Sequence, residues 1–487
     1  MRLTALAVLL APLAGCAGAS AFRCPANGGP AWRELATDHF VLRTDLPSAR
    51  AASLAGRLER MRAAVEGALG GLELPDAVEL PGRIEVIAFA SRAGFEPFAP
   101  DGANGYYLRY AGGPPRIVLS GEIQAWQRAL LAHELTHHFL AGRFPRQPRW
   151  FAEGLAVYME SLGDDPAQGA LVVGDPPRER LERARQARRT VRELLAWDGR
   201  AGDREGSLEY YASSWLLVHW LVHSRPDAFA GLQRRFAEAE APDAAWRAVL
   251  PEYDPGRPGG PERLDALLAQ HARSRIEVVH RTVEVPPSVG YFENALPPAE
   301  VHAIRLALWS HGPEKPAAAL RAEIDEALSE APAHPVALQL LATFEGEDPV
   351  RLARASTAAH PEDARAWTFL GLALEGGKVA AEREAAYRRA LELAPENPAA
   401  LHNLATELDA QGRPGEALPI ARRAARLAPW SPPLLAGYAA ILSELGRCAE
   451  AIPVLARALD VLPEQSPEAS RRDLETKRDA YTAQCAR

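Results

Sequence analysis

The chain has 487 residues, of which 47% are hydrophobic and 24% are charged, and its formal net charge is −8. This length exceeds what a single hydrophobic core usually serves, so we expect two or three domains. The composition is that of a soluble globular protein, and the lack of long basic runs argues against a nucleic-acid-binding surface.

The N-terminus has the pattern of a secretory signal. Arg2 precedes an apolar run, Leu3 to Leu13, that is too short for a permanent membrane span. The run ends in L-A-G-C at Cys16, which resembles the lipobox of bacterial lipoprotein signal peptides. The resemblance implies removal of residues 1–15, acylation of Cys16, and a lipid-anchored envelope protein that faces the periplasm, with the outer membrane favoured. The alternative is an ordinary cleaved signal with a chance cysteine.

Three more cysteines follow, and their number leaves at least one unpaired in an oxidising compartment. Cys24 lies in a Gly/Pro-rich tether over residues 16–31, whereas Cys448 and Cys485 both lie near the C-terminus. A disulfide between the last two is one possibility, and three free thiols is the other.

The next region predicts a small sheet with one long helix. Alternating or β-branched runs predict strands at residues 37–44, 83–89, 105–110 and 116–120, and an amphipathic pattern predicts a helix over 48–69. The last two strands form a hairpin just ahead of the most informative motif. Its edge could accept an extended peptide by β-augmentation or could be a plain sheet edge, and both interpretations stay open.

That motif is H-E-x-x-H, in an apolar run that begins at Trp126. His133 and His137 are four residues apart, so on a helix both imidazoles point from one face toward one ion. Glu134 is rotated about 100° from His133, where it can act on a water without being a ligand.

A catalytic zinc site needs a third protein ligand, and Glu153 is the candidate. Residues 142–148 can end the first helix, and Pro148 suits the first turn of the next one. That second helix would bring Glu153 back toward the two histidines.

These two segments resemble the gluzincin metallopeptidases of the bacterial peptidase-MA-like group, whose members read H-E-[LF]-x-H and then W-[LF]-x-E-G-[LF]-A-x-Y. This chain has H-E-L-T-H from His133 and W-F-A-E-G-L-A-V-Y from Trp150. The resemblance implies an α+β zincin-like domain over residues 32–285. It also implies Zn²⁺ held by His133, His137 and Glu153, with Glu134 as the general base.

Four further side chains bear on the site. The resemblance suggests Tyr211 as an oxyanion donor, although a buried structural tyrosine is the stronger alternative. His219 and His223 repeat the four-residue spacing, but apolar residues surround them and neither is followed by a carboxylate. We expect packing or surface roles for both, and for His138, which is rotated off the ligand face.

Downstream, the pattern is helical. Short and long helices are expected at residues 190–197 and 210–221, more helices over 227–272, and a final strand over 276–285. Pro286-Pro287 marks a boundary, after which residues 286–360 read as a helical linker with degenerate repeats.

The last third has a repeat of 34 residues, marked by Pro361, Pro395, Pro429 and Pro463. The period and the recurring small positions resemble tetratricopeptide repeats, so residues 361–487 are predicted to form an all-α solenoid with a capping helix. Its groove could bind a peptide or protein partner, or the array could only brace the first domain.

Together these features predict a zinc-dependent peptidase of the bacterial cell envelope, with a peptide or protein substrate and a repeat arm for clients or partners. The membrane is contacted only by the lipid anchor, and no nucleic acid is involved. The rival is an inactive, lipid-anchored scaffold that acts through its repeats. An aminopeptidase is disfavoured because no G-x-M-E-N-like anchor for a free amine occurs in the sequence.

Overall fold

The structure is a computed structural model. It describes residues 22–70, 82–99, 105–108, 115–121, 125–165, 170–173, 175, 178–200, 204–281, 289–310, 316–377, 379–463 and 466–486. The expected signal peptide and Cys16 therefore lie outside the described residues. Among the helices that are described, none has the length and apolar character needed to cross a bilayer.

A six-stranded mixed sheet forms the first part of the molecule, in the order β4-β5-β3-β2-β1-β9. The three central strands, β2, β3 and β5, run parallel, while β1, β4 and β9 are antiparallel to their neighbours. The strands are β1 (Arg33–Ala36), β2 (Phe40–Thr44), β3 (Ile84–Phe89), β4 (Gly105–Leu108), β5 (Arg116–Ser120) and β9 (Phe292–Ala295).

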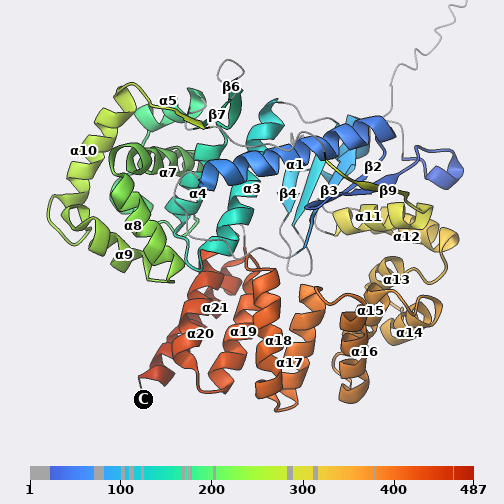
Figure 1. The fold of residues 1–487 in the computed structure, drawn as a ribbon. Coiled ribbons are helices and arrows are strands. Elements are labelled where there is room, and N and C mark those ends of the chain that lie inside the picture. The colour runs from blue at the N-terminus through green and yellow to red at the C-terminus, as the bar shows by residue number, and fades with distance from the viewer. Residues whose placement is uncertain are drawn as a thin grey trace, which may run out of the picture.

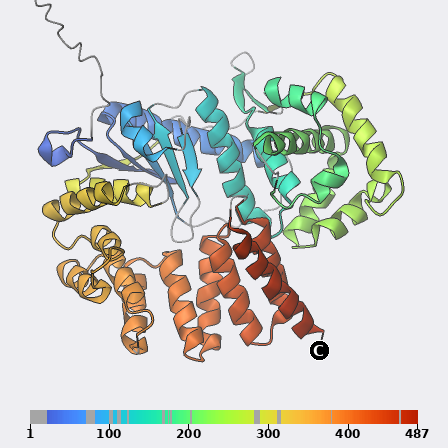
Figure 2. The same ribbon diagram turned by 180° about the vertical axis from the view of Figure 1, so that it is seen from behind.

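Both faces of this sheet are covered by helices, as the central strands require. Along β3, Val86 and Ala88 belong to the core shared with α1 (Ser48–Gly70), whereas Ile87 and Phe89 belong to the core shared with α11 (Pro298–Trp309). Successive side chains on a strand point to opposite faces, so a strand with apolar side chains on both faces needs cover on both sides. Figures 1 and 2 show α1 and α11 on opposite sides of the strands.

A helical lobe follows β5 and contains both segments of the predicted site. Its helices are α3 (Ala125–Arg143), α4 (Arg149–Met159), α5 (Arg178–Gln186), α6 (Val191–Leu195), α7 (Arg204–Ser224), α8 (Pro226–Ala237), α9 (Pro242–Val249) and α10 (Gly260–Arg273). A second, antiparallel sheet of order β6-β7-β8 borders it, with strands β6 (Gly163–Asp165), β7 (Ala170–Val173) and β8 (Val279–Arg281).

The C-terminal part is a stack of helix pairs that curves beneath the sheet and the lobe (Figure 1). Two pairs precede Pro361 and three follow it, and a long helix closes the stack. The helices after α11 are α12 (Ala317–Glu330), α13 (Pro335–Leu341), α14 (Pro349–Ala359), α15 (Ala364–Ala373), α16 (Ala380–Leu393), α17 (Pro398–Ala410), α18 (Pro414–Leu427), α19 (Pro432–Glu444), α20 (Cys448–Asp460) and α21 (Glu468–Cys485).

The small residues of the 34-residue period are explained by helix packing. Gly371, Ala405 and Ala439 occupy equivalent buried positions, and a Cβ on Gly371 would lie 2.3 Å from the ring of Tyr387. Arg383, which departs from the repeat pattern, is paired with Glu407 and also donates to the Leu374 carbonyl at 3.0 Å. At this position of the repeat, a charged side chain with hydrogen-bonded partners therefore takes the place of a small side chain.

Several predicted elements have the expected bounds, and others do not. The helix over 48–69 and the strands over 83–89 and 116–120 match α1, β3 and β5 closely. The strand expected over 276–285 is only β8 within the described residues, and it belongs to the small sheet rather than to the main one. Pro148 is the N-cap of α4 rather than a residue of its first turn.

The chain returns to the main sheet after the expected boundary at residue 285. Strand β9 pairs with β1 in register Arg33↔Ala295, and α11, the next helix, covers one face of the sheet. Strand β9 was not predicted, because its four residues are all exposed and carry no alternation of apolar and polar positions. The repeat array therefore begins on the sheet itself.

The cysteine alternatives are resolved by the fold. Cys448, the first residue of α20, forms a disulfide with Cys485 at the end of α21, while Cys24 is a free, buried thiol. The disulfide closes a loop of 37 residues and ties the capping helix to the last repeat.

Removal of this disulfide by Cys448→Ser with Cys485→Ser should lower the free energy of unfolding of the repeat array by about 2–4 kcal/mol, because the unfolded loop regains conformational freedom. Urea unfolding monitored by circular dichroism measures the change. Cys24→Ser in the intact chain is the control for loss of a thiol. An unchanged unfolding midpoint in the double variant would contradict the prediction.

Candidate metal centre

Two antiparallel helices bring the three predicted ligands together. His133 and His137 project from α3, and their Nε2 atoms lie 3.1 Å apart. Glu153 projects from α4, with its Oε2 atom 3.2 Å from His137 Nε2 and 3.5 Å from His133 Nε2. Among the described residues, this is the one group of three or more potential ligands whose donor atoms all lie within 4.8 Å of one another.

The glycine after Glu153 sets how close α4 lies to its neighbour. A Cβ on Gly154 would be 2.5 Å from the backbone oxygen of Ser214 and 2.7 Å from a methyl carbon of Val218, both on α7. Only a residue without a Cβ allows this approach. In the E-G pair of the motif, Glu153 is the predicted ligand, and Gly154 allows the close contact with α7 that fixes the position of α4.

Burial and charge make the three side chains one electrostatic unit. Burial alone would lower the pKa of His133, but hydrogen bonds to Glu153 and Glu160 overcome this effect and raise that pKa to about 10. Burial would raise the pKa of Glu153, yet His137 and His133 hold it well below its usual value. A buried carboxylate is thus kept ionised by two imidazoles.

This donor set fits a zinc ion. Two imidazole nitrogens and one carboxylate oxygen are the protein ligands of one common class of catalytic zinc site, in which a further position is left for water. Glu153 is 6% exposed and His137 is 7% exposed, so the carboxylate needs a nearby positive charge. A dication at the meeting point of the three side chains would supply that charge.

A second carboxylate, which sequence reasoning missed, orients His133. Glu160 Oε1 lies 3.0 Å from His133 Nδ1, and Arg180 of α5 lies 3.2 Å from the same carboxylate oxygen. A hydrogen bond at Nδ1 leaves Nε2 as the nitrogen that faces the other ligands. The sequence spacing could have indicated this second carboxylate. Glu160 follows Glu153 by seven residues, or about two helical turns, which places both residues on one side of the helix.

Tyr211 lies beside the centre. Its ring, on α7, is 6.4 Å from the ring of His133 in an edge-on arrangement, and the Arg180 guanidinium is 5.7 Å from its centroid. The ring of Trp197 packs against it at 5.9 Å. The structure thus brings Tyr211 near the predicted ligands, while its role in binding an oxyanion stays a prediction.

Glu134 and His138 are four residues apart on α3, so they share a face of the helix next to the one that carries the predicted ligands. Glu134 is half-buried, and its negative charge is one of those that raise the pKa of His133. His138 is turned away from the ligands, and its ring lies 6.0 Å from that of Trp430, at the start of a C-terminal repeat. His138 therefore packs against the solenoid.

The second histidine pair is part of a neutral, hydrogen-bonded cluster. His219 Nδ1 lies 2.9 Å from His271 Nε2, and its Nε2 lies 2.9 Å from the Glu277 carbonyl oxygen. The ring of His223 stacks on His219 with centroids 4.1 Å apart, and Tyr158 Oη is 3.2 Å from His223 Nε2. Burial, followed by the charge of His223, lowers the pKa of His219 to about 3.

Cys24 belongs to another buried constellation. Its Sγ atom lies 3.1 Å from His302 Nε2, and His302 Nδ1 lies 2.6 Å from Glu323 Oε1. Burial raises the pKa of the Cys24 thiol, so the reactive thiolate is disfavoured. With 3% exposure of Cys24 and none of His302, the group ties the N-terminal segment to α11 and α12 and is closed to substrates.

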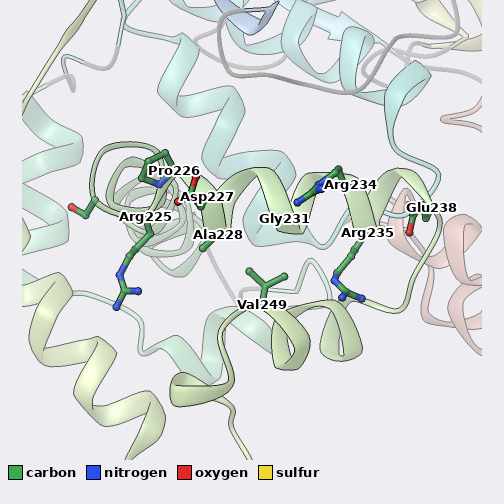
Figure 3. A pocket seen from close by; sticks show the side chains of 10 residues that line it. Arg225, Pro226, Asp227, Ala228, Gly231, Arg234, Arg235, Glu238 and Val249 are labelled. Atoms are coloured by element: carbon green, nitrogen blue, oxygen red, sulfur yellow. The ribbon is translucent and has the colours of Figure 1, made fainter.

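A surface groove of about 670 Å³ lies between α8 and α9, away from the metal centre. Figure 3 shows Val249 of α9 facing Gly231 of α8, with Arg225 and Arg235 toward the two ends. Arg235 is paired with Glu240 at 2.6 Å, outside the groove lining. No buried polar side chain points into the groove among those described, so it has no set of side chains comparable to His133, His137 and Glu153.

Family models match two parts of the chain. One described as "Protein of unknown function (DUF1570)" matches residues 128–242, a segment that contains every predicted metal ligand and Tyr211. Two tetratricopeptide repeat models match residues 386–418 and 408–471. No curated protein matches the chain. The C-terminal part thus contains tetratricopeptide repeats.

Several solved structures are similar to part of the chain. They include TTC0263, a thermophilic TPR protein of Thermus thermophilus, with 18% identity over 38% of this chain and 95% of that chain and a TM-score of 0.29. YrrB, described as a TPR protein with an unusual peptide-binding site, has 16% identity over 37% and 91%, with a TM-score of 0.28. PilF of Pseudomonas aeruginosa has 18% identity over 38% and 89%, with a TM-score of 0.30.

Gly154→Ala should lower the free energy of unfolding by about 1–3 kcal/mol, because the added methyl group overlaps the α7 backbone. Gly415→Ala is the matched control, since a Cβ at this helical position meets nothing within 4 Å. The control should be neutral or slightly stabilising. Equal unfolding midpoints for Gly154→Ala and the wild type would contradict the packing argument.

The His219 cluster predicts a loss of stability in acid. His219 is neutral in the fold down to pH about 3 but takes up a proton in the unfolded chain below pH 6.5. The unfolded state therefore binds more protons as the pH falls from 6.5 toward 3, and His219 alone costs about 2 kcal/mol of stability by pH 5.

Urea unfolding at about pH 7.5 and about pH 5 measures this effect. His219→Gln should lose less stability between the two values than the wild type does, because the titrating group is gone. Identical losses in the two proteins would show that His219 does not contribute to the pH dependence.

Proposed function

We propose that the protein is a zinc-dependent peptidase of the bacterial cell envelope, with a gluzincin-like catalytic part and a tetratricopeptide arm for clients or partners. The observation that carries the proposal is the meeting of His133 Nε2, His137 Nε2 and Glu153 Oε2 within 3.5 Å of one another. The H-E-x-x-H helix and the E-G helix are therefore parts of one centre.

Zn²⁺ bound there would polarise the scissile carbonyl and lower the pKa of a water. Glu134, next to His133 on α3, accepts the proton of the attacking water at its carboxylate and delivers it to the leaving amine nitrogen. Tyr211, whose ring lies 6.4 Å from that of His133, would donate its hydroxyl hydrogen to the developing oxyanion. Glu160 keeps the His133 ring in the orientation that ligation needs.

Strand β4 is the best place for an extended substrate. It is the edge of the main sheet beside β5, and it lies against the metal helix α3. Its outer edge pairs with no strand among the described residues, so its backbone groups can bind an extended peptide. This arrangement favours cleavage within a chain over recognition of a free terminus.

The repeats supply the second part of the proposal. Tetratricopeptide arrays present extended surfaces to peptides or proteins, so this array would hold clients or a partner. The lipobox-like L-A-G-C at Cys16 supports a lipid anchor in the outer membrane with the body in the periplasm. The disulfide of Cys448 and Cys485 is compatible with that oxidising compartment.

A scaffold without catalytic activity is the second candidate. It is favoured by the tetratricopeptide repeats, which account for a large part of the chain by themselves. In that case the metal site would be structural and Glu134 would be dispensable.

Glu134→Gln should reduce hydrolysis of an unfolded protein substrate at least about a hundredfold, because the general base is lost, while zinc stays bound. Product formation is followed by gel electrophoresis, and bound zinc by atomic absorption. Glu182→Gln, on the exposed face of α5, is the matched control.

The zinc peptidase proposal requires that wild-type activity disappears with a chelator and returns with Zn²⁺. Activity of Glu134→Gln equal to that of the wild type would overturn the mechanism. A wild-type protein that binds zinc but cleaves no unfolded substrate would favour the scaffold.

A further inference from the structure

The last tetratricopeptide repeat is docked on the two helices that carry the zinc ligands. Arg457 of α20 donates to the Ala141 carbonyl at 2.8 Å and to the Phe144 carbonyl at 3.2 Å, at the end of α3. Arg146, between α3 and α4, is paired with Asp460 at 2.8 Å. Figures 1 and 2 both show this end of the solenoid against the base of α3.

One residue joins this docking surface to a ligand. Arg149 donates to the backbone carbonyl of Leu462, just after α20, and its guanidinium also lies 3.6 Å from Glu153 Oε1. The other carboxylate oxygen, Oε2, is the one that faces His133 and His137. The two oxygens of Glu153 are thus assigned different partners.

Arg149 occupies a position that the helix itself disfavours. It is the first residue of α4, and the first turn contains no acidic residue to offset its charge. Positive charge at a helix N-terminus is opposed by the helix dipole. The Arg149 side chain is 16% exposed. It contacts Glu153, one helical turn later, and the Leu462 carbonyl of the repeat, and these two contacts offset the unfavourable position of its charge.

We propose that Arg149 is a positioning residue of the zinc centre and that the terminal repeat holds it there, so that docking of the repeat and zinc affinity are coupled. This inference rests on the zinc site proposed above. The coupling is reciprocal: if the docked repeat favours zinc, bound zinc favours the docked repeat to the same extent. A partner that draws the last repeat away from α3 would therefore weaken zinc binding.

The test compares zinc affinity, measured by competition with a chromophoric chelator, in the full chain and its variants. Arg149→Met keeps the length of the side chain but loses both polar contacts, and it should weaken zinc binding about tenfold or more. Arg149→Lys keeps the charge but cannot reproduce the fork that spans Glu153 and Leu462, so its loss should be smaller.

Arg146→Met is the matched control. Arg146 is also 16% exposed and belongs to the same docking surface, but its partner is Asp460 rather than a zinc ligand. Its zinc affinity should stay within about twofold of the wild-type value. Equal weakening by Arg146→Met and Arg149→Met, or wild-type affinity in Arg149→Met, would overturn the positioning role.

Amide hydrogen exchange reports the coupling without any use of activity. Zinc should slow exchange in α20 of the wild type and have little effect there in Arg149→Met. No effect of zinc on α20 in the wild type would overturn the coupling. Failure of the wild type to bind zinc would instead remove the proposed function, so the two failures are distinguishable.

Discussion

The buried carboxylate of Glu153 is the constraint on which the candidate site depends. A charge at 6% exposure is tolerable only beside groups that compensate it, and the imidazoles of His133 and His137 do so on one oxygen while Arg149 does so on the other. These groups come from two helices, α3 and α4, whose relative position must be fixed. Gly154 fixes the position of α4 against α7, and the Leu462 carbonyl holds Arg149 against the repeats.

The parts predicted from the sequence are those with local periodicity. His133 and His137 share a helix face, and the 34-residue period of Pro361 and its successors appears as helix pairs. Glu153 was predicted from its spacing after the first helix and from a family motif, and the structure brings it to both histidines. In each of these cases, the residues that form the pattern lie on one helix or on two consecutive helices.

The missed features depend on contacts between distant segments. Glu160 orients His133 across the α3–α4 pair, and His271 joins His219 from a helix 52 residues later. Strand β9 is too short and too exposed to be recognised, yet it adds a strand to the sheet beside β1. Hydrophobic periodicity contains no information about such pairings, because tertiary packing decides them.

The buried contact of Cys24 with His302 also limits where the body of the protein lies. Cys24 is the eighth residue after Cys16, and an extended chain spans at most about 3.6 Å per residue, so the reach is below about 30 Å. An acylated Cys16 would therefore keep α11 and the first repeats close to the bilayer surface. With the proposed lipid anchor, the body of the protein would therefore contact partners near the membrane surface rather than at a distance from it.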